Sequence, residues 1–426
     1  MISRTDPAFA DSMQHPFRTE QISGAYQGNY PIREIFRRFY PSYEAEHQGL
    51  DENKRKTARM IMACKTGELG YSLEVCPECG VFSIHNASCN NRSCPCCQHP
   101  QEKKWVAERK TELIEGIAYY HVIITLPEEL NPLIRANEKL LLTLFFHCVN
   151  DTLLSLCEDK RYMGAKPAIM AVLHTWGQKL NYHPHIHVCL SGGGLTKQGS
   201  FVESRHKGFI IPQPVIAASF RGRFLCSLKK LYETGQLSFV FTPSLEAPEE
   251  WKEFIDALFD KQWMPFLKET FNGKGNAIEY LGRYSYRTAI SNSRILSIEN
   301  EQITFRYKDY KDGKMKTRTV SGSAFIGMFL QHILPKGFSR IRYAGYITNG
   351  AKKRSLKLIH KLRGSTYQGN PYRNMKMREL ILTLFNRDIG CCPHCQCKEV
   401  LTLVNIRGKP GNAVPAHPST PIAALS

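Results

Sequence analysis

The stretch "HTWGQKLNYHPHIHV", which runs from His174 to Val188, decides the fold of this chain of 426 residues. It places His183, His185 and His187 at alternate positions. Successive side chains of a β-strand point to opposite faces, so a strand here would carry these imidazoles on one face. Ile186 would then point to the other face, into the core. The pattern therefore predicts a strand with one chemically active face.

Working outward, the spacing of apolar residues predicts the neighbouring elements. Two strands over 168–176 and 185–192 are joined by a polar turn that contains Pro184, and another strand is expected over 118–126. Residues 293–320 suggest two or three short strands. Helices are predicted over 53–63, 101–116, 135–160, 215–233, 249–271 and 276–290, and again after Ser321.

The paired histidines of this strand are candidate metal ligands. Two imidazoles on a rigid strand can hold a divalent cation and leave coordination positions for a substrate oxygen. A third ligand has to come from elsewhere, and His174 on the neighbouring strand and His183 before Pro184 are the candidates. Two histidines separated by one residue are also common in ordinary cores, so the pair alone leaves both interpretations open.

A second chemical motif lies about a hundred residues later, in the predicted helix "NAIEYLGRYSYRTAI" over 276–290. Tyr280 and Tyr284 are four residues apart and would share one helix face, with Arg283 and Arg287 close by. A tyrosine hydroxyl has a pKa near 10, so it attacks a phosphodiester only where cations offset the developing charge. Two core aromatics on an amphipathic helix are the alternative.

The cysteines of residues 64–100 predict a zinc module. Cys76-x2-Cys79 and Cys94-x2-Cys97 are separated by fourteen residues, a spacing typical of a four-cysteine zinc site with two knuckles. Such a site is usually structural. Several other residues could replace a ligand or hold a second ion: Cys64, His85, Cys89, Cys96 and His99.

A second cysteine cluster, "CCPHCQC", spans residues 391–397. Cys392 and Cys395 form half of a zinc knuckle, which needs ligands from elsewhere in the chain. The tail that follows is rich in proline and alanine, and its composition predicts disorder.

The formal net charge of +19 favours a polyanionic partner, and nucleic acid is the commonest. Residues 313–378 contain fifteen Lys and Arg and no Asp or Glu, interleaved with aromatic residues. Cations bind phosphates and aromatic rings stack on unpaired bases, so this composition suits single-stranded DNA. Core aromatics under a basic surface would explain the rings but not the missing acids. The candidate DNA-binding residues are Arg294, Lys336, Arg340, Arg342, Lys352, Lys353 and Arg354.

No secretory signal is visible at the N-terminus, and the longest apolar stretches, such as 139–149, fall short of a membrane span. We therefore expect a cytoplasmic protein that associates with the nucleoid and not with a membrane. Thiols stay reduced in that compartment, so the fifteen cysteines point to metal binding and not to disulfides.

Taken together, these motifs resemble the rolling-circle insertion-sequence transposases of the HUH class, two-tyrosine type. The H-hydrophobic-H motif of that family matches His185-Ile186-His187, and its Y-x3-Y motif matches Tyr280 and Tyr284. Its N-terminal zinc-binding domain matches "CPECG…SCNNRSCPCC", and "HVIITLPEEL" and "HILPKGFSRIRYAGY" also resemble stretches of these proteins. The resemblance covers roughly residues 50–360. Tyr286, a third nearby tyrosine, and Cys96, a thiol inside the knuckle, depart from the pattern.

The resemblance implies cleavage and rejoining of single-stranded DNA with Mg²⁺ or Mn²⁺, beside a structural Zn²⁺. A tyrosine would attack the metal-activated phosphate and leave a 5′-phosphotyrosine and a free 3′-hydroxyl, and the second tyrosine would take a second strand. A plasmid or phage replication initiator with the same chemistry is one alternative. A non-catalytic zinc-finger regulator of DNA is the other.

The expected architecture is α+β, with an HUH nuclease core in which an antiparallel sheet carries the histidines between flanking helices. The sequence does not indicate the oligomeric state or the target DNA. The predicted order is an arm with a short helix over 1–50, a zinc-binding module over 51–102, the nuclease core over 103–320, a basic DNA-binding region over 321–390, and the cysteine cluster with a disordered tail over 391–426.

Overall fold

The computed structural model describes residues 22–23, 30–204, 210–271, 282, 288–309 and 312–408. It divides the chain into two compact units. The first unit comprises residues 1–101, 290–327 and 374–426, and the second comprises 102–289 and 328–373. Each unit is therefore assembled from segments that lie far apart in the sequence. This division differs from the linear succession of domains that the sequence suggested.

An antiparallel sheet forms the centre of the second unit, as predicted. Its strands are ordered β12-β5-β6-β4-β8, and β7 pairs with β6 at one end. The quoted histidine stretch supplies the end of β5, the turn and the start of β6. The strands are β4 (Tyr119–Thr125), β5 (Lys166–Trp176), β6 (Tyr182–Leu195), β7 (Phe201–Glu203), β8 (Phe266–Phe271) and β12 (Ile341–Gly345).

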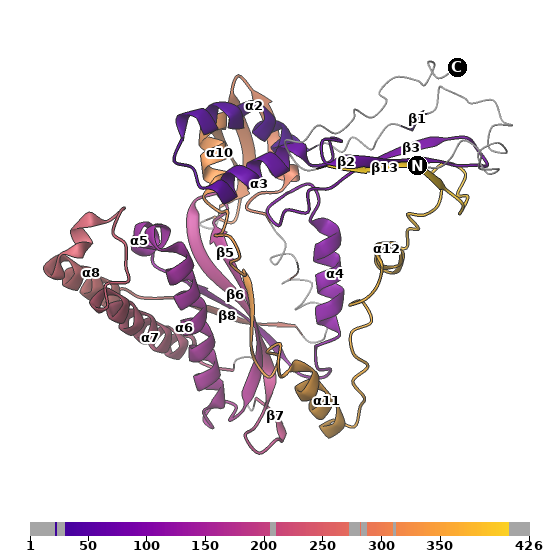
Figure 1. The fold of residues 1–426 in the computed structure, drawn as a ribbon. Coiled ribbons are helices and arrows are strands. Elements are labelled where there is room, and N and C mark those ends of the chain that lie inside the picture. The colour runs from indigo at the N-terminus through magenta and orange to yellow at the C-terminus, as the bar shows by residue number, and fades with distance from the viewer. Residues whose placement is uncertain are drawn as a thin grey trace. The chain divides into compact units, whose positions relative to one another are not determined.

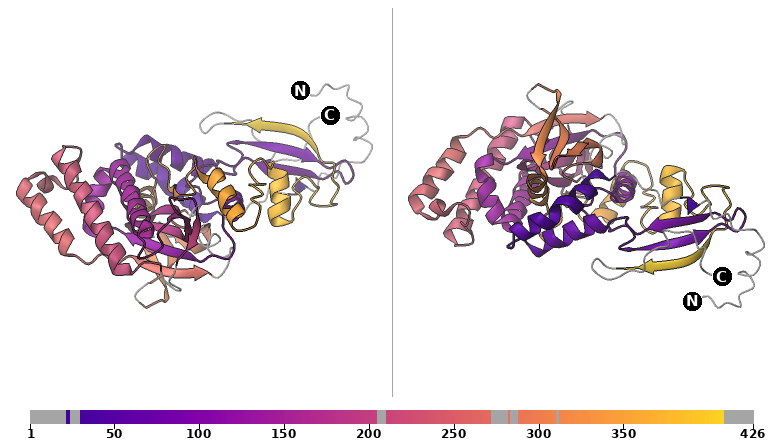
Figure 2. Two further views of the ribbon diagram at one scale, coloured as in Figure 1. Left: turned by 90° about the horizontal axis from the view of Figure 1, so that it is seen from below. Right: turned by 90° about the horizontal axis from the view of Figure 1, so that it is seen from above.

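Strict alternation of side chains separates the two faces of this sheet. Ile186 and Val188 of β6 are fully buried in a core built against α6 (Glu138–Glu158), α7 (Gln213–Glu233) and α8 (Pro248–Asp260). Figures 1 and 2 show these helices together on one side of the sheet. The short elements η2 (Glu128–Leu130), α5 (Asn131–Ala136) and η3 (Pro243–Glu246) complete this layer.

The opposite face packs against α4 (His99–Lys110) and α11 (Lys352–Leu362). Val172 of β5 and Cys189 of β6 lie in this smaller core with Trp105 and Leu356. His185 and His187 have the same parity as Cys189, so β6 presents them on the face that α4 and α11 partly cover.

Among the described residues, α6 is the one helix whose length and composition would allow it to cross a membrane, but half of its most apolar stretch is buried within the protein. Its buried side chains include Leu142, Phe145 and Phe146, which belong to the core beneath the sheet. This packing is that of a core helix in a globular protein.

The first unit contains the helices α2 (Pro31–Glu46) and α3 (Glu52–Ala63). It contains a four-stranded sheet ordered β1-β3-β2-β13 and a three-stranded sheet ordered β11-β10-β9. The latter confirms the short strands expected over 293–320. The remaining elements of the chain are β1 (Ile22–Ser23), β2 (Gly70–Val75), β3 (Phe82–Asn86), η4 (Asn292–Arg294), β9 (Ile295–Glu299), β10 (Gln302–Lys308), β11 (Met315–Ser321), α10 (Gly322–Leu330), α12 (Met377–Phe385) and β13 (Leu401–Arg407).

The N-terminal arm, for which the sequence predicts a short helix, contains α2, whose Ile32, Ile35 and Phe36 are fully buried. One expectation from the sequence is corrected here. The helix predicted over 249–271 ends at Asp260, where Lys261 turns extended, and Pro265 keeps the residue before it out of helical geometry ahead of β8.

The sequence did not predict β13, which forms an ordered strand between the second cysteine cluster and the tail predicted to be disordered. Thr402, Val404 and Ile406 of β13 pair with β2, and Val404 and Ile406 pack on its apolar side chains. Residues 409–426, which the sequence predicts to be disordered, lie outside the described residues.

Candidate functional site

The sheet brings three histidines together. His185 and His187 come from β6, and the antiparallel register places His174 of β5 directly opposite His185. One ring nitrogen of each lies within 4.8 Å of those of the other two. The three rings are steeply inclined to one another, with centroids 4.8–5.3 Å apart. Nitrogen atoms that converge in this way can share one cation.

Hydrogen bonds orient two of these rings. The backbone carbonyl of His183 accepts a hydrogen bond of 2.7 Å from Nδ1 of His185. A carbonyl only accepts, so Nδ1 carries the proton and Nε2 keeps its lone pair. His183 contributes through its backbone and is not a member of the three-histidine group, although the sequence made it a candidate ligand.

His187 is held by a residue that the sequence analysis missed. Nε2 of His121, on β4, lies 2.9 Å from Nδ1 of His187, and the two rings are nearly parallel. If Nδ1 of His187 donates this bond, its Nε2 carries the lone pair that coordination of a cation requires. His121 is one histidine in an apolar strand, and only the pairing of β4 with β6 places it beside the cluster.

The environment of His185 and His121 favours the neutral imidazole, which is the form that binds metal. Burial lowers the pKa of His185 to about 4. Burial, assisted by the charge of His185, lowers the pKa of His121 to about 4 as well. His174 is also buried, and its ring stacks on Trp176 at a centroid distance of 4.4 Å. The site is therefore a rigid, preformed set of nitrogen donors.

Tyr280, Arg283, Tyr284 and Arg287 lie outside the described residues. Gly282, which falls between the two tyrosines, is described and is buried. A Cβ atom at Gly282 would overlap the side chain of Val106 on α4. Val106 belongs to the core on the histidine-bearing face of the sheet. Gly282 itself therefore lies close against α4.

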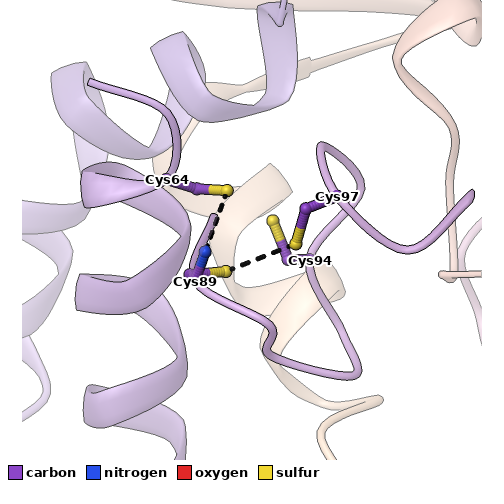
Figure 3. A group of neighbouring side chains, drawn as sticks. All are labelled: Cys64, Cys89, Cys94 and Cys97. Carbon is purple, nitrogen blue, oxygen red and sulfur yellow. Dashed lines mark hydrogen bonds between the residues drawn. The ribbon is translucent and has the colours of Figure 1, made fainter. Parts of the chain in front are cut away.

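A separate cluster of thiols occurs in the first unit (Figure 3). Cys64 ends α3, and Cys89, Cys94 and Cys97 follow β3, with all four sulfurs within 4.8 Å of one another. The backbone N–H of Cys89 points at Cys64 Sγ at 3.5 Å. Hydrogen bonds to thiolates stabilise the charged form, and those around Cys64, from Cys89 above all, hold its pKa well below the usual range.

A second group of thiols joins Cys76 and Cys79 to Cys392 and Cys395. The spacing of the sequence suggested that Cys76 and Cys79 would share one tetrahedron with Cys94 and Cys97, and this pairing is wrong. The first knuckle lies between β2 and β3, whereas Cys94 and Cys97 pack against the end of α3.

Four sulfurs in one group are the donor set that zinc prefers, and its sites of this kind are tetrahedral and closed. The buried group of Cys64, Cys89, Cys94 and Cys97 fits a structural Zn²⁺ by its chemistry, because burying one thiolate among others without a cation would be costly. Cys96, the departure noted in the sequence, is not a member of that group.

The basic residues proposed to bind DNA occupy different environments. Lys353 and Arg354 are exposed on α11, and Lys336 is exposed in the loop after α10. Lys352 instead forms a 2.7 Å ion pair with Glu112, whose side chain is only 4% exposed.

Three further members of that set are partly buried. Arg342 stacks over Phe146 at 4.6 Å, and burial lowers its pKa. Arg294 donates to the backbone oxygen of Arg306 at 2.8 Å. Arg340 is half-buried. The exposed cations of α11 and Lys336 remain the better placed for a phosphate backbone.

Comparison with known proteins agrees with this arrangement. Residues 168–355, which include the paired histidines, match the family described as "Putative transposase". Residues 35–126 match the family described as "Transposase zinc-binding domain". No solved structure matches the chain.

Two relatives are similar over almost their whole length. "Putative transposase y4qJ" of Sinorhizobium fredii is 35% identical over 384 residues, which cover 89% of this chain and 96% of that protein. "Transposase for insertion sequence element IS801" of Pseudomonas savastanoi pv. phaseolicola is 28% identical over 393 residues, 90% of this chain and 91% of the relative. The chain therefore belongs to the family of HUH-class insertion-sequence transposases of the two-tyrosine type, with an N-terminal transposase zinc-binding domain.

Proposed function

We propose that this transposase nicks and rejoins single-stranded DNA at the ends of its own mobile element, by the rolling-circle route. The observation that carries the proposal is the convergence of His174, His185 and His187 on one face of the central sheet. Neutral imidazoles that leave other coordination positions open suit a catalytic cation better than a structural one.

The cation would be Mg²⁺ or Mn²⁺, held by the Nε2 atoms of His185 and His187 and by a ring nitrogen of His174. When bound, such an ion polarises the phosphodiester and offsets negative charge that develops during attack. His121 would act on the site indirectly, by keeping the proton of His187 on Nδ1.

The nucleophile would be Tyr280 or Tyr284. Its hydroxyl oxygen bonds to phosphorus, the bond from phosphorus to the 3′ oxygen breaks, and the phenolic proton passes to solvent or to the departing oxygen. The products are a 5′-phosphotyrosine and a free 3′-hydroxyl. Because the ester energy is kept in the new bond, a 3′-hydroxyl can reverse the step on another strand. Arg283 and Arg287 would offset phosphate charge during both steps.

The DNA would be single-stranded, held by exposed cations such as Lys336, Lys353 and Arg354. The compartment would be the cytoplasm, with the protein on the nucleoid. Family membership supports a transposase over a replication initiator that uses the same chemistry. The preformed histidine group argues against a regulator without catalysis, which would have no use for it.

The test uses labelled single-stranded oligonucleotides that carry the flanks of the gene's mobile element. With Mn²⁺ present, denaturing electrophoresis should show a protein–DNA adduct that survives boiling. His187→Ala should abolish it, whereas His183→Ala, on the same strand but outside the group, should keep it. Tyr280→Phe and Tyr284→Phe should each impair strand transfer, whereas Tyr286→Phe should reduce it only slightly.

An adduct that persists when Tyr280 and Tyr284 are both changed to Phe would assign the nucleophile elsewhere. Tight DNA binding by the wild-type protein without any adduct would favour the regulator.

A further inference from the structure

Two turns far apart in the sequence have the same backbone geometry. The first is Cys76-Pro77-Glu78-Cys79 and the second is Cys392-Pro393-His394-Cys395. In the first, the N–H of Gly80 donates to the carbonyl of Cys76 at 2.9 Å, and the N–H of Cys76 donates to that of Val81 at 3.0 Å.

The second turn repeats both hydrogen bonds at the corresponding positions. The N–H of Gln396 donates to the carbonyl of Cys392 at 3.0 Å, and the N–H of Cys392 donates to that of Cys397 at 2.8 Å. Gly80 and Gln396 both have a left-handed φ, of +69° and +62°. A left-handed conformation is costly for a residue such as glutamine, so the second turn adopts this shape for a reason other than local preference.

The sulfur atoms of the two turns face each other. Sγ of Cys76 lies 3.4 Å from Sγ of Cys395, and Sγ of Cys79 lies 3.6 Å from Sγ of Cys392. A disulfide would need about 2.05 Å. Two sulfurs on one tetrahedral zinc, each at about 2.3 Å from the ion, would lie about 3.8 Å apart. The observed distances therefore fit shared coordination and exclude a covalent pair.

The pairing of the strands beside the two turns brings the turns close together independently of the cysteines. β13 pairs antiparallel with β2 from Leu401 opposite Val75 to Arg407 opposite Gly70. Figure 2 shows β13 beside the β2–β3 hairpin. Gly70 is required here, because a Cβ atom on it would overlap the backbone of β13. The resulting sheet carries one turn at the end of β2 and the other ahead of β13.

We propose that the transposase binds a second zinc ion, held by Cys76, Cys79, Cys392 and Cys395, in addition to the one in the buried group of Cys64, Cys89, Cys94 and Cys97. The second ion fastens the C-terminal segment to the N-terminal hairpin, so that one zinc-bound sheet is built from both ends of the chain. Two of its ligands, Cys79 and Cys392, are 313 residues apart in the sequence.

The two ions should differ in how readily they are lost. All four cysteines of the first group are buried, whereas Cys395 is exposed and Cys79 is half-buried. A chelator therefore reaches the second site directly but reaches the first only after local opening.

The experiment measures zinc in the purified full-length protein by elemental analysis. Wild type should contain two zinc ions per chain, and the double variant Cys392→Ser with Cys395→Ser should contain one. The matched control, Cys391→Ser with Cys397→Ser, alters the two neighbouring thiols outside the group and should retain two. A chromogenic chelator should release zinc from wild type in two equal phases, and the faster phase should be missing from the first double variant alone.

Limited proteolysis adds a structural readout. Cleavage within residues 388–408 should appear in the Cys392/Cys395 variant and not in the control, because the segment loses its attachment. One zinc per wild-type chain, iron in place of zinc, or a disulfide that links Cys76 to Cys395 would each overturn the proposal. The wild-type measurements decide the matter even if the double variant does not fold.

Discussion

Nε2 of His121 lies 2.9 Å from Nδ1 of His187, and the two rings are parallel to within 2°. The residues come from neighbouring strands and are both buried. One ring therefore dictates which nitrogen of the other carries a proton, and so which nitrogen can face a cation.

Replacing His121 with Phe keeps a ring of similar size and removes this hydrogen bond. We expect the affinity of the site for Mn²⁺ to fall on the order of 10–100-fold, as is typical when a partner of a metal-binding histidine is lost. Titration followed by electron paramagnetic resonance measures this directly. His121→Gln, which keeps a polar partner, should lose less. Equal affinities in wild type and His121→Phe would reduce His121 to a packing residue.

Acid should affect this site less than an exposed histidine site. With a pKa of about 4, His185 stays neutral well below pH 6. At pH 5.5 about 97% of such an imidazole remains neutral, against about 9% for one with an ordinary pKa of about 6.5. The Mn²⁺ affinity should therefore change little between pH 7 and pH 5.5. A tenfold or greater loss over that interval would mean that the histidines titrate normally.

Gly282→Ala tests the close approach of this glycine to α4. The added methyl group would overlap Val106, so adduct formation should fall by tenfold or more while DNA binding persists. Val106→Ala removes the side-chain atoms that the new methyl group would overlap. The double variant Gly282→Ala with Val106→Ala should therefore recover part of the adduct formation. Gly222→Ala on α7, where a methyl group would meet nothing within 4 Å, is the control and should be active. Failure of Val106→Ala to rescue would place the effect elsewhere.

Two adjacent lysines of α11 should behave differently. Lys353→Ala should weaken single-stranded DNA binding and lower the salt dependence by about one ion, because this side chain is exposed. Lys352→Ala removes a partner of buried Glu112, which keeps Arg109 at 2.9 Å. We expect it to lower the free energy of unfolding by roughly 1–3 kcal/mol. Denaturant unfolding and salt-dependent DNA binding are measured on both variants. A loss of stability in Lys353→Ala, or a loss of DNA binding alone in Lys352→Ala, would contradict the prediction.

The alternating histidines allowed β6 and its histidine-bearing face to be predicted from the sequence, because period-two alternation is a local property. The sequence left His174 on the neighbouring strand and His183 as alternative third ligands. His121 could not be found in this way. Its position depends on the register between β4 and β6, and a slip of one residue would turn it to the other face. Its strand is otherwise apolar and carries no mark of a site.

The cysteines show the opposite error. Two knuckles fourteen residues apart suggested a single site, because nearness in sequence was taken for nearness in space. In the structure Cys76 and Cys79 meet Cys392 and Cys395, while Cys64 at the end of α3 completes the other group. Each C-x2-C turn was recognisable by itself. Which second turn completes the group of Cys76 and Cys79 depends on the pairing of β13 with β2. No local sequence pattern predicts that pairing.

The separation of Cys79 from Cys392 by 313 residues also has a consequence in time. At roughly 5–20 residues per second, a ribosome needs on the order of 15–60 s to make the intervening chain. The first group is synthesised within a short stretch of chain, so its four thiols can bind zinc soon after they leave the ribosome: Cys64, Cys89, Cys94 and Cys97. The pair Cys76 and Cys79 lacks its partner thiols until Cys392 and Cys395 have been made. A nascent chain that is cut short before Cys392 never completes the second four-cysteine group. Closure of the second group therefore marks a transposase whose translation has passed Cys395.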